Sequence, residues 1–313
     1  MRIKTRLQEI RKTRGFSAAD LAGRVGVTRQ TIYCIEDGSF VPNTAVSLKL
    51  ARTLQVTVEE LFSTEPAKSQ KASLKSLRSL TNAGNRLLLA GCDPALSFVS
   101  EALRPSGIEI VTVPCSSRRA LAWLKQGKID AAGAHLVDRS TGEYNLPIIR
   151  RLFPPAAIRV VTFAAWEQGL LVRRGNPKTI RSVADLGRRG VTLMNREKGS
   201  GSRDLLDAAL RDAAIPLQRV NGYDSIASGH LPAAYAVAAG AADCCIAPRS
   251  AARCFGLDFL PIATERFDLA FTQASLDLPA AKALLDLLNG SQLRGKLHTL
   301  AGYDTAHTGK LQL

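Results

Sequence analysis

The sequence contains no long apolar run and no apolar signal core. No stretch of eighteen or more apolar residues occurs, and the opening MRIKTRLQEIRKTRG is charged and helical in pattern. We therefore expect a soluble cytoplasmic protein that has no membrane partner.

Motifs typical of enzymes are also missing. The glycine-rich loop NREKGSGSR at residues 195–203 is neither the G-x-x-x-x-G-K-[ST] phosphate loop nor G-x-G-x-x-G, and it is not the Gly-x-Ser-x-Gly elbow of hydrolases. No nucleophile with a base, no pair of acids and no metal centre stands out. We therefore expect neither an enzyme nor a bound metal.

The cysteines lack the spacings of metal or redox motifs. They include no C-x-x-C and no Cys/His pair at zinc-ligand spacing, so most are expected to be reduced and buried. The adjacent Cys244-Cys245 pair lies in a strand-like run, where a buried strand is a better explanation than redox or metal chemistry. The six are Cys34, Cys92, Cys115, Cys244, Cys245 and Cys254.

The chain does have length and positive charge. Its 313 residues and 46% hydrophobic content predict about two domains with real cores. The 42 Lys and Arg residues exceed the 27 Asp and Glu residues, giving a formal charge of +15. This excess favours a polyanionic partner such as nucleic acid.

The first 63 residues have the pattern of a small helical domain. Apolar positions from Leu7 to Phe62 recur mostly at spacings of three and four, which predicts five short helices. Leu48, Leu50 and Leu54 are among these positions. Ser17 with Asp20 and, after Gly26, Thr28 provide helix caps. Two of these helices, joined by a tight turn at residues 23–27, predict a helix-turn-helix.

The line from RLQEIRKTRGFSAADLAGRVGVTRQTIYCIEDG to TLQVTVEELF resembles the Cro and phage-repressor type of DNA-binding domain, the XRE family. The resemblance implies that residues 28–37 form a recognition helix in the major groove of double-stranded DNA, and that the protein binds as a homodimer or higher homo-oligomer. Arg29 and Gln30 would read bases. For Arg29 the alternative is a solvated surface charge. The predicted DNA-binding residues are Ser17, Thr28, Arg29, Gln30, Thr31 and Tyr33.

A basic linker is expected at residues 64–85. It is rich in Ser, Lys and Ala, and Leu74, Leu77 and Leu80 leave open whether it forms a short helix or a flexible tether. From residue 86 to residue 313, short β-rich runs alternate with helical stretches in two series. This alternation predicts an α/β domain with two lobes.

Ligands of α/β sheets bind beyond the carboxyl ends of the strands, where helix N-termini favour small oxyanions. Polar residues follow the predicted strands at several places. For Ser200 to Ser202 the alternative is a plain helix cap, for Arg203 a pair with Asp207, and for His135 a structural hydrogen bond. The predicted ligand-binding residues are Cys92, Asp93, Ser116, Ser117, His135, Tyr144, Ser200, Gly201, Ser202 and Arg203. Weaker candidates are Asp138, Asn145, Trp166, Tyr223, Asp224, Ser225 and His230. Trp166 is equally suited to packing at a hinge between the lobes.

A second resemblance rests on AGAHLVDRSTGEYNLP, WEQGLLVRRGNPKTI, NREKGSGSRDLLD and AYAVAAGAADCCIAPRSAARCFGLDFLPIATERFDL. These segments resemble the periplasmic-binding-protein-like domain of bacterial regulators, over roughly residues 86–305. The resemblance implies an all-α helix-turn-helix domain followed by an α/β two-lobed type II periplasmic-binding-protein-like domain. It also implies a small effector, with molybdate or tungstate as the leading oxyanion. Cys92 and Ser202 depart from the usual residues of that family.

The two resemblances together imply a ligand-responsive transcriptional regulator. A ligand bound between the lobes would change their relative angle and so modulate operator binding. The alternative is a DNA-binding regulator whose second domain senses nothing and acts as a scaffold for dimerisation or protein docking.

Overall fold

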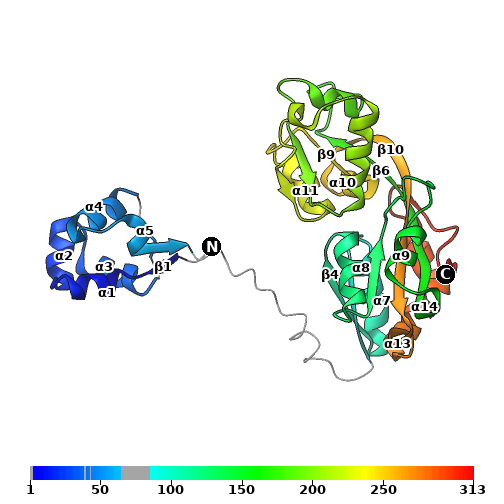
Figure 1. Ribbon diagram of the computed structural model, residues 1–313, viewed down its shortest axis with the longest axis horizontal. Helices are drawn as coiled ribbons and strands as arrows, with labels where there is room; N and C mark the ends of the chain where they lie inside the picture. The colour runs from blue at the N-terminus through cyan, green and yellow to red at the C-terminus, as the bar shows by residue number, and fades with distance from the viewer. Residues whose placement is uncertain (1–2, 39, 43, 65–84) are drawn as a thin grey trace. The chain divides into compact units, whose positions relative to one another are not determined.

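The computed structural model describes residues 3–38, 40–42, 44–64 and 85–313. The chain separates into two compact units, Met1–Ser76 and Leu77–Leu313 (Figure 1). The predicted linker, including its leucines, falls almost entirely on residues 65–84 and so lies outside the described residues. The predicted domain boundaries therefore remain a prediction.

The first unit contains the five predicted helices and a short antiparallel ribbon that the sequence pattern did not predict. The ribbon pairs Ile3 with Thr64 and Thr5 with Phe62, which joins the two ends of the domain. The elements are β1 (Ile3–Thr5), α1 (Leu7–Thr13), α2 (Ala18–Val25), α3 (Arg29–Glu36), α4 (Thr44–Leu54), α5 (Val58–Leu61) and β2 (Phe62–Thr64).

The core of this unit follows the predicted apolar positions with one exception. Leu7, Leu21, Ile32 and Leu54 are fully or almost fully buried. Leu48, expected among the apolar positions, is instead 44% exposed. The buried side of α4 runs through positions 47, 50, 51 and 54, so position 48 faces solvent on the helix period of 3.6.

The second unit is built on one nine-stranded sheet, in the order β4-β3-β5-β10-β6-β9-β7-β8, with β11 paired to β6. Its strands are β3 (Arg86–Gly91), β4 (Glu109–Pro114), β5 (Ala131–Ala134), β6 (Ile158–Val172), β7 (Leu193–Arg196), β8 (Ile226–Ala227), β9 (Cys244–Pro248), β10 (Asp258–Thr272) and β11 (Tyr303–Asp304). Its helices are α7 (Leu96–Leu103), α8 (Ser117–Lys125), α9 (Leu146–Leu152), α10 (Gly201–Asp212), α11 (His230–Ala238), α12 (Arg249–Phe255), α13 (Gln273–Leu276), α14 (Pro279–Asn289) and α15 (Ser291–His298). Short 3-10 turns cover Arg104–Ser106, Pro155–Ala157, Val183–Gly187 and Leu217–Arg219.

Two long strands join the two lobes of this unit. The first lobe is built on β3, β4 and β5, and the second is built on β7, β8 and β9. β6 and β10 pair antiparallel along their whole length, from Ile158 opposite Thr272 to Val172 opposite Asp258. The last third of β10 pairs with β5 in the first lobe, whereas the last third of β6 pairs with β9 in the second. The predicted crossing at residues 166–169 is the point where β6 passes from one lobe to the other (Figure 1). The pairs β3–β4, β3–β5, β7–β8 and β7–β9 are parallel, whereas β11 pairs with β6 antiparallel.

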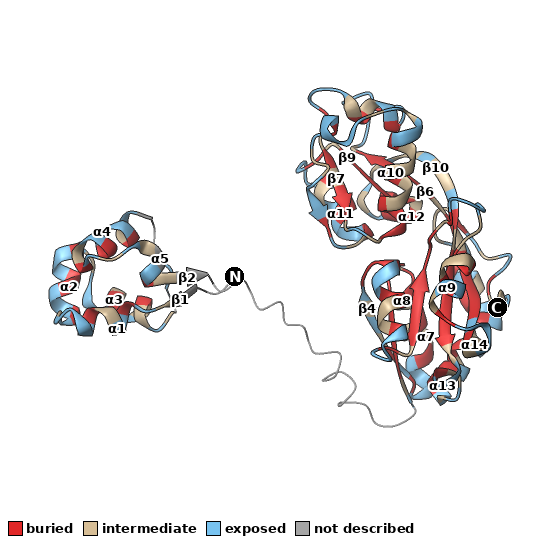
Figure 2. Cartoon of the chain, viewed as in Figure 1, coloured by how far each residue is buried: buried red, intermediate tan, exposed pale blue. Residues whose placement is uncertain are grey.

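Each lobe has its own core. One cluster, around Phe163, Phe267 and Leu284, lies in the first lobe, and two clusters cover the opposite faces of the sheet in the second. Figure 2 shows most strands of both lobes as buried, apart from β4 and the first half of β10. Cys244 and Cys245 lie in β9 and are fully buried, as predicted. Among the described residues, no helix has the length and apolar character needed to cross a membrane.

Candidate functional site

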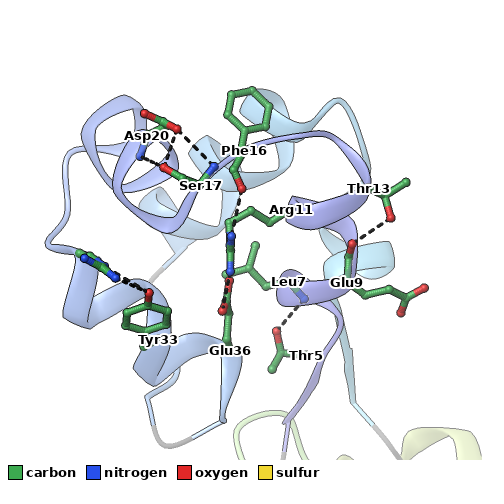
Figure 3. Close-up of polar contacts among 11 residues, drawn as sticks. Thr5, Leu7, Glu9, Arg11, Thr13, Phe16, Ser17, Asp20, Tyr33 and Glu36 are labelled. Atoms are coloured by element: carbon green, nitrogen blue, oxygen red, sulfur yellow. Dashed lines mark hydrogen bonds and ion pairs between the residues drawn. The ribbon is translucent and has the colours of Figure 1, made fainter.

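Caps fix the start of α2 and the turn between α2 and α3. The Asp20 amide donates to Ser17 Oγ at 3.1 Å, and the Asp20 carboxylate accepts the Ser17 amide at 3.2 Å, which completes a capping box (Figure 3). α2 ends at Gly26 with φ of 78°, a left-handed conformation that glycine adopts at little cost. Thr28 Oγ1 then accepts the Thr31 amide at 3.1 Å and caps α3. The Ser17 hydroxyl is therefore committed to its helix cap.

The predicted base-reading residues lie on the exposed side of α3. Ile32 and Ile35 are buried, whereas Arg29, Gln30 and Tyr33 are exposed. The Arg29 guanidinium donates to the Tyr33 hydroxyl through Nε at 3.1 Å and Nη2 at 2.9 Å. This contact holds Arg29 along the first turns of α3, where side chains of a recognition helix meet base edges.

Replacing Arg29 with alanine is expected to weaken operator binding roughly tenfold to a hundredfold. An arginine bidentate to guanine contributes about 1–3 kcal/mol of discrimination. The measurement is a gel-shift titration on a duplex selected by the protein from a random library. Arg52→Ala removes an equal charge from the exposed side of α4 and is the matched control. An equal loss of operator affinity in both variants would contradict the base-reading role of Arg29.

In the second unit, three residues distant in sequence form a buried hydrogen-bonded chain. Cys92, after β3, places Sγ 3.1 Å from Nε2 of His135, which follows β5. His135 Nδ1 lies 2.6 Å from Oε2 of Glu265 on β10. Burial alone would lower the pKa of His135, but the charges of Cys92 and Glu265 and the hydrogen bonds to both raise it above its ordinary value. Glu265 was not among the predicted residues.

Asp93 lies beside this chain. Its Oδ1 accepts the Tyr303 hydroxyl at 2.5 Å and the Ala95 amide at 2.8 Å. Its buried Oδ2 has no hydrogen-bond partner in the described part of the chain. Burial raises the pKa of Asp93 to about 7, although the two hydrogen bonds and the nearby His135 act in the opposite direction.

The raised pKa of Asp93 predicts a pH-dependent stability. Because the folded protein holds this proton more tightly than the unfolded chain, the contribution of Asp93 to stability is complete below pH 4 and is lost as the pH rises through 7. Between pH 5 and pH 7 we expect wild type to lose about 2 kcal/mol of unfolding free energy that Asp93→Asn retains. Urea unfolding followed by tryptophan emission measures this difference. Equal pH slopes in the two proteins would contradict it.

Four buried donor-bearing atoms around this chain lack partners among the described residues. They belong to side chains of the crossing strand β6 and of the second lobe, and we call them the donor cluster. They are Trp166 Nε1, Gln168 Nε2, His230 Nε2 and Ser250 Oγ. The indole of Trp166 lies 5.2 Å from the His135 ring and 5.5 Å from the His230 ring, centroid to centroid.

Contacts around the donor cluster determine which of its atoms remain unpaired. Gln168 Oε1 accepts the Ser202 hydroxyl at 3.4 Å, which leaves Nε2 of the same amide unpaired. The Tyr303 ring lies 5.8 Å from Trp166, and its hydroxyl interacts with Ser250, although the two hydroxyl groups do not have the distance and angles of a hydrogen bond. Of the four residues in the donor cluster, Trp166 and His230 were considered in the sequence analysis, whereas Gln168 and Ser250 were missed.

His230 presents an N–H group rather than a lone pair to the cluster. Its Nδ1 lies 2.8 Å from Nη1 of Arg196, and a guanidinium can only donate. Nδ1 must therefore accept, which places the proton of the neutral ring on Nε2. Burial, together with the charges of Arg196 and His135, lowers the pKa of His230 well below its ordinary value and keeps the ring neutral.

The tautomer of His230 disfavours a metal ion at this place. Cys92, His135 and His230 bring ligand atoms within 4.8 Å of one another. A metal on His230 Nε2 would move the ring proton to Nδ1, where two N–H groups would then face each other across 2.8 Å. The arrangement therefore suits an anion that accepts hydrogen bonds better than it suits a cation.

The first turn of α10 serves as a cap and as a contact between lobes. Ser200 Oγ accepts the Arg203 amide at 3.3 Å, so the predicted alternative of a helix cap is present. Arg203 donates to Asp207 and to the Arg196 carbonyl oxygen, both at 3.1 Å. The pair with Asp207 is the alternative predicted for Arg203. Both bonds direct its guanidinium into the second lobe. The Gly201 backbone lies against the ring and carbonyl group of His135.

The two lobes are closed on each other. The Arg118 amide donates to the Gly199 carbonyl oxygen at 3.1 Å, and the Arg118 guanidinium pairs with Asp204 at 3.0 Å. Ser116 and Ser117, which begin α8, lie at this contact, and Ser117 Oγ accepts the His135 amide at 3.3 Å. Most of the predicted ligand residues thus gather at one interlobe seam.

Tyr144 is the predicted residue that the structure places elsewhere. Its hydroxyl donates to the Thr264 carbonyl oxygen at 2.8 Å, and it lines a separate pocket of about 230 Å³. An outer groove of about 750 Å³ also lies along the seam, and several of its charges are paired with each other, as Arg118 is with Asp204 and Arg151 with Asp138. The donor cluster, whose atoms have no partner among the described residues, is our candidate ligand site.

Comparisons with known proteins agree with both units. Residues 7–61 match the helix-turn-helix family, and residues 100–289 match the family described as the PBP superfamily domain. The uncharacterized protein YvgK of Bacillus subtilis (strain 168) is 30% identical over 96% of this chain and 99% of its own length.

Two solved structures share the fold of the second unit. A candidate phosphate ABC transporter substrate-binding protein of Clostridium perfringens, solved with bound phosphate, has a TM-score of 0.53 and 13% identity over 68% of this chain and 97% of that one. The sulfate-binding protein SubI of Mycobacterium tuberculosis H37Rv has a TM-score of 0.51 and 22% identity over 70% of this chain and 86% of that one. The chain therefore belongs to the PBP superfamily domain family, and it carries this ligand-binding domain behind a helix-turn-helix DNA-binding domain of the XRE type.

Proposed function

We propose that this protein is a transcriptional regulator controlled by a small tetrahedral oxyanion bound between the lobes. Molybdate and tungstate are the leading candidates from the family resemblance. The phosphate and sulfate named for the two structural neighbours belong to the same chemical class and support it. Binding as a homodimer to a palindromic operator is part of the proposal.

The unpartnered donor cluster is the observation that carries this proposal. Leaving one buried donor unsatisfied costs roughly 1–3 kcal/mol, and native proteins tolerate few such groups. Here there are four, one of them the indole nitrogen of Trp166, and the tautomer of His230 makes its Nε2 a donor. A tetrahedral oxyanion accepts several hydrogen bonds from different directions. It would satisfy groups that the protein alone leaves open.

The helix dipoles at the cluster favour a negative ligand. α10 and α11 both begin at the cluster, with Gly201 against His135 and with His230 itself. The first amides of a helix have no intrahelical acceptor, and the helix dipole places partial positive charge there. Arg196 is fully buried and holds His230, but its charge is paired with Glu197 at 2.9 Å. The proposed anion would thus bind between two helix ends.

A ligand at this place would bias the closed state of the lobes. The donors lie on the crossing strand and in the second lobe, and His135 of the first lobe lies against Trp166 and His230, so closing the lobes would enclose the anion. Differential affinity for closed and open forms is what an effector needs in order to change operator binding. We propose that the residues between the two units transmit this change.

The chain offers an intrinsic probe for the test. Trp123 and Trp166 are its two tryptophans. In a Trp123→Phe protein, Trp166 is therefore the sole fluorescent tryptophan, and its Nε1 lies in the donor cluster. Adding molybdate, tungstate, sulfate or phosphate should change the emission at micromolar concentration for at least one oxyanion and raise the melting temperature.

Calorimetry with Trp166→Phe tests the donor itself. Removing one hydrogen bond to a charged ligand costs about 1.5–3 kcal/mol, so affinity should fall roughly tenfold to a hundredfold. Trp123→Phe, the same change at a half-buried position of α8, is the matched control and should bind as wild type does. No response to any oxyanion would contradict the proposal and favour the scaffold alternative.

A further inference from the structure

Two cysteines lie next to each other at the edge of the donor cluster. Gly91 on β3 pairs with Pro114 on β4, and Cys92 and Cys115 are the next residues on these strands. The Cys115 amide donates to the Gly91 carbonyl oxygen at 3.2 Å, so the ladder continues up to the cysteines. Neighbouring strands lie about 4.8 Å apart, inside the range of roughly 4.4–6.8 Å between Cα atoms in disulfides.

The environments of the two thiols differ. Cys92 Sγ faces Nε2 of His135 at 3.1 Å, and Glu265 holds the other ring nitrogen at 2.6 Å. This is the thiol, base and orienting acid arrangement that activates a cysteine nucleophile. Burial, with the adjacent charge of Cys92, raises the pKa of Cys115 to about 12, which keeps Cys115 protonated.

We propose that Cys92 is a peroxide-reactive thiol, and that Cys115 resolves it to an intramolecular disulfide. The proposal goes beyond oxyanion sensing and does not depend on it. Both cysteines retain slight exposure, 8% each, whereas Cys244 and Cys245 have none. A small hydroperoxide is therefore the oxidant that fits.

The chemistry balances in two steps. In the first, the Cys92 thiolate attacks one oxygen of the hydroperoxide, the O–O bond breaks, and the proton on His135 Nε2 goes to the leaving oxygen, giving a sulfenic acid and an alcohol or water. In the second, Cys115 sulfur attacks Cys92 sulfur, the S–O bond breaks, and the hydroxyl leaves as water with the Cys115 proton. Two thiols are oxidised by two electrons in total, and one hydroperoxide is reduced.

The test uses the reduced full-length protein and one molar equivalent of hydrogen peroxide, followed by alkylation and peptide mass spectrometry. Trypsin leaves both cysteines on one peptide, residues 87–118, because the bond after Arg104 precedes a proline. Cleavage after Glu101 and Glu109 separates them, so a disulfide is recognised as two joined fragments. We expect this cross-link to form while the exposed Cys254 remains alkylated as a free thiol.

Three variants separate the roles of the residues. Cys115→Ser should trap Cys92 as a sulfenic acid that dimedone captures, and Cys92→Ser should leave Cys115 reduced. Glu265→Gln, checked for folding by its melting curve, should slow alkylation of Cys92 at pH 7 by at least about tenfold while Cys254 reacts at its usual rate.

Oxidation at Cys254 alone, or slower alkylation of Cys92 than of Cys254 in wild type, would overturn the proposal. Because none of these readouts involves an oxyanion or DNA, a negative result here leaves the proposed function separately testable.

Discussion

Replacing Gly201 with alanine is expected to prevent the lobes from closing and to reduce oxyanion affinity by about a hundredfold. A Cβ at this position would overlap the carbonyl oxygen and the ring of His135 in the opposite lobe. Within its own helix the change is harmless, since Gly201 opens α10 with an ordinary backbone conformation and alanine is the best helix former. Overpacking against a backbone group costs about 3 kcal/mol, and here opening the lobes avoids it.

Calorimetry gives the affinity of this variant, and small-angle scattering reports whether added oxyanion compacts it. Gly295→Ala is the matched control, because Gly295 lies in α15 with no atom within 4 Å of an added Cβ. The control should bind as wild type does and be slightly more stable. Wild-type affinity in Gly201→Ala would show that closure at His135 is not needed for binding.

Replacing Arg11 with methionine is expected to destabilise the DNA-binding unit by about 3–5 kcal/mol. Arg11 on α1 donates to Glu36 on α3 through Nε at 2.6 Å and Nη2 at 3.1 Å, and to the Phe16 carbonyl oxygen through Nη1 at 3.0 Å (Figure 3). Both charged side chains are more than nine-tenths buried. Removing one partner leaves the Glu36 carboxylate buried and unpaired, which accounts for the large cost.

Domains of this size are only marginally stable, so much of this unit should be unfolded in Arg11→Met at 37 °C. Helical circular dichroism during thermal unfolding and operator binding measure the effect. Arg6→Met makes the same change in the exposed pair Arg6–Glu9 and should leave the melting temperature nearly unchanged. If both variants unfolded alike, the Arg11–Glu36 pair would not hold α1 to α3.

Local patterns in the sequence were sufficient to predict the helix-turn-helix and the two α/β lobes. Caps such as Ser17 with Asp20, and apolar spacings such as Leu21 to Val25, act within one or two helical turns. The alternation of strands and helices after residue 86 likewise predicted β3, α7 and β4. The ribbon of β1 and β2 was missed because its two strands are separated by the whole DNA-binding domain.

The candidate site was predictable only in part. Strand ends indicated Cys92, Asp93 and His135, but Glu265 lies 130 positions beyond His135 in the middle of a long strand. No local pattern distinguishes a strand glutamate that faces a histidine from one that faces solvent. Gln168 was missed for the same reason, and Arg203 was assigned to the ligand although its helix supplies Asp207 as a partner.

Operator affinity, measured with and without oxyanion at constant ionic strength, tests whether an oxyanion controls DNA binding by this protein. Fluorescence anisotropy of a labelled operator selected by the wild-type protein should give a dissociation constant that changes at least about fivefold when the tightest-binding oxyanion is added. Trp166→Phe should require a much higher oxyanion concentration for the same change. An operator affinity that is identical with and without saturating oxyanion, in a protein shown by calorimetry to have bound it, would contradict the account.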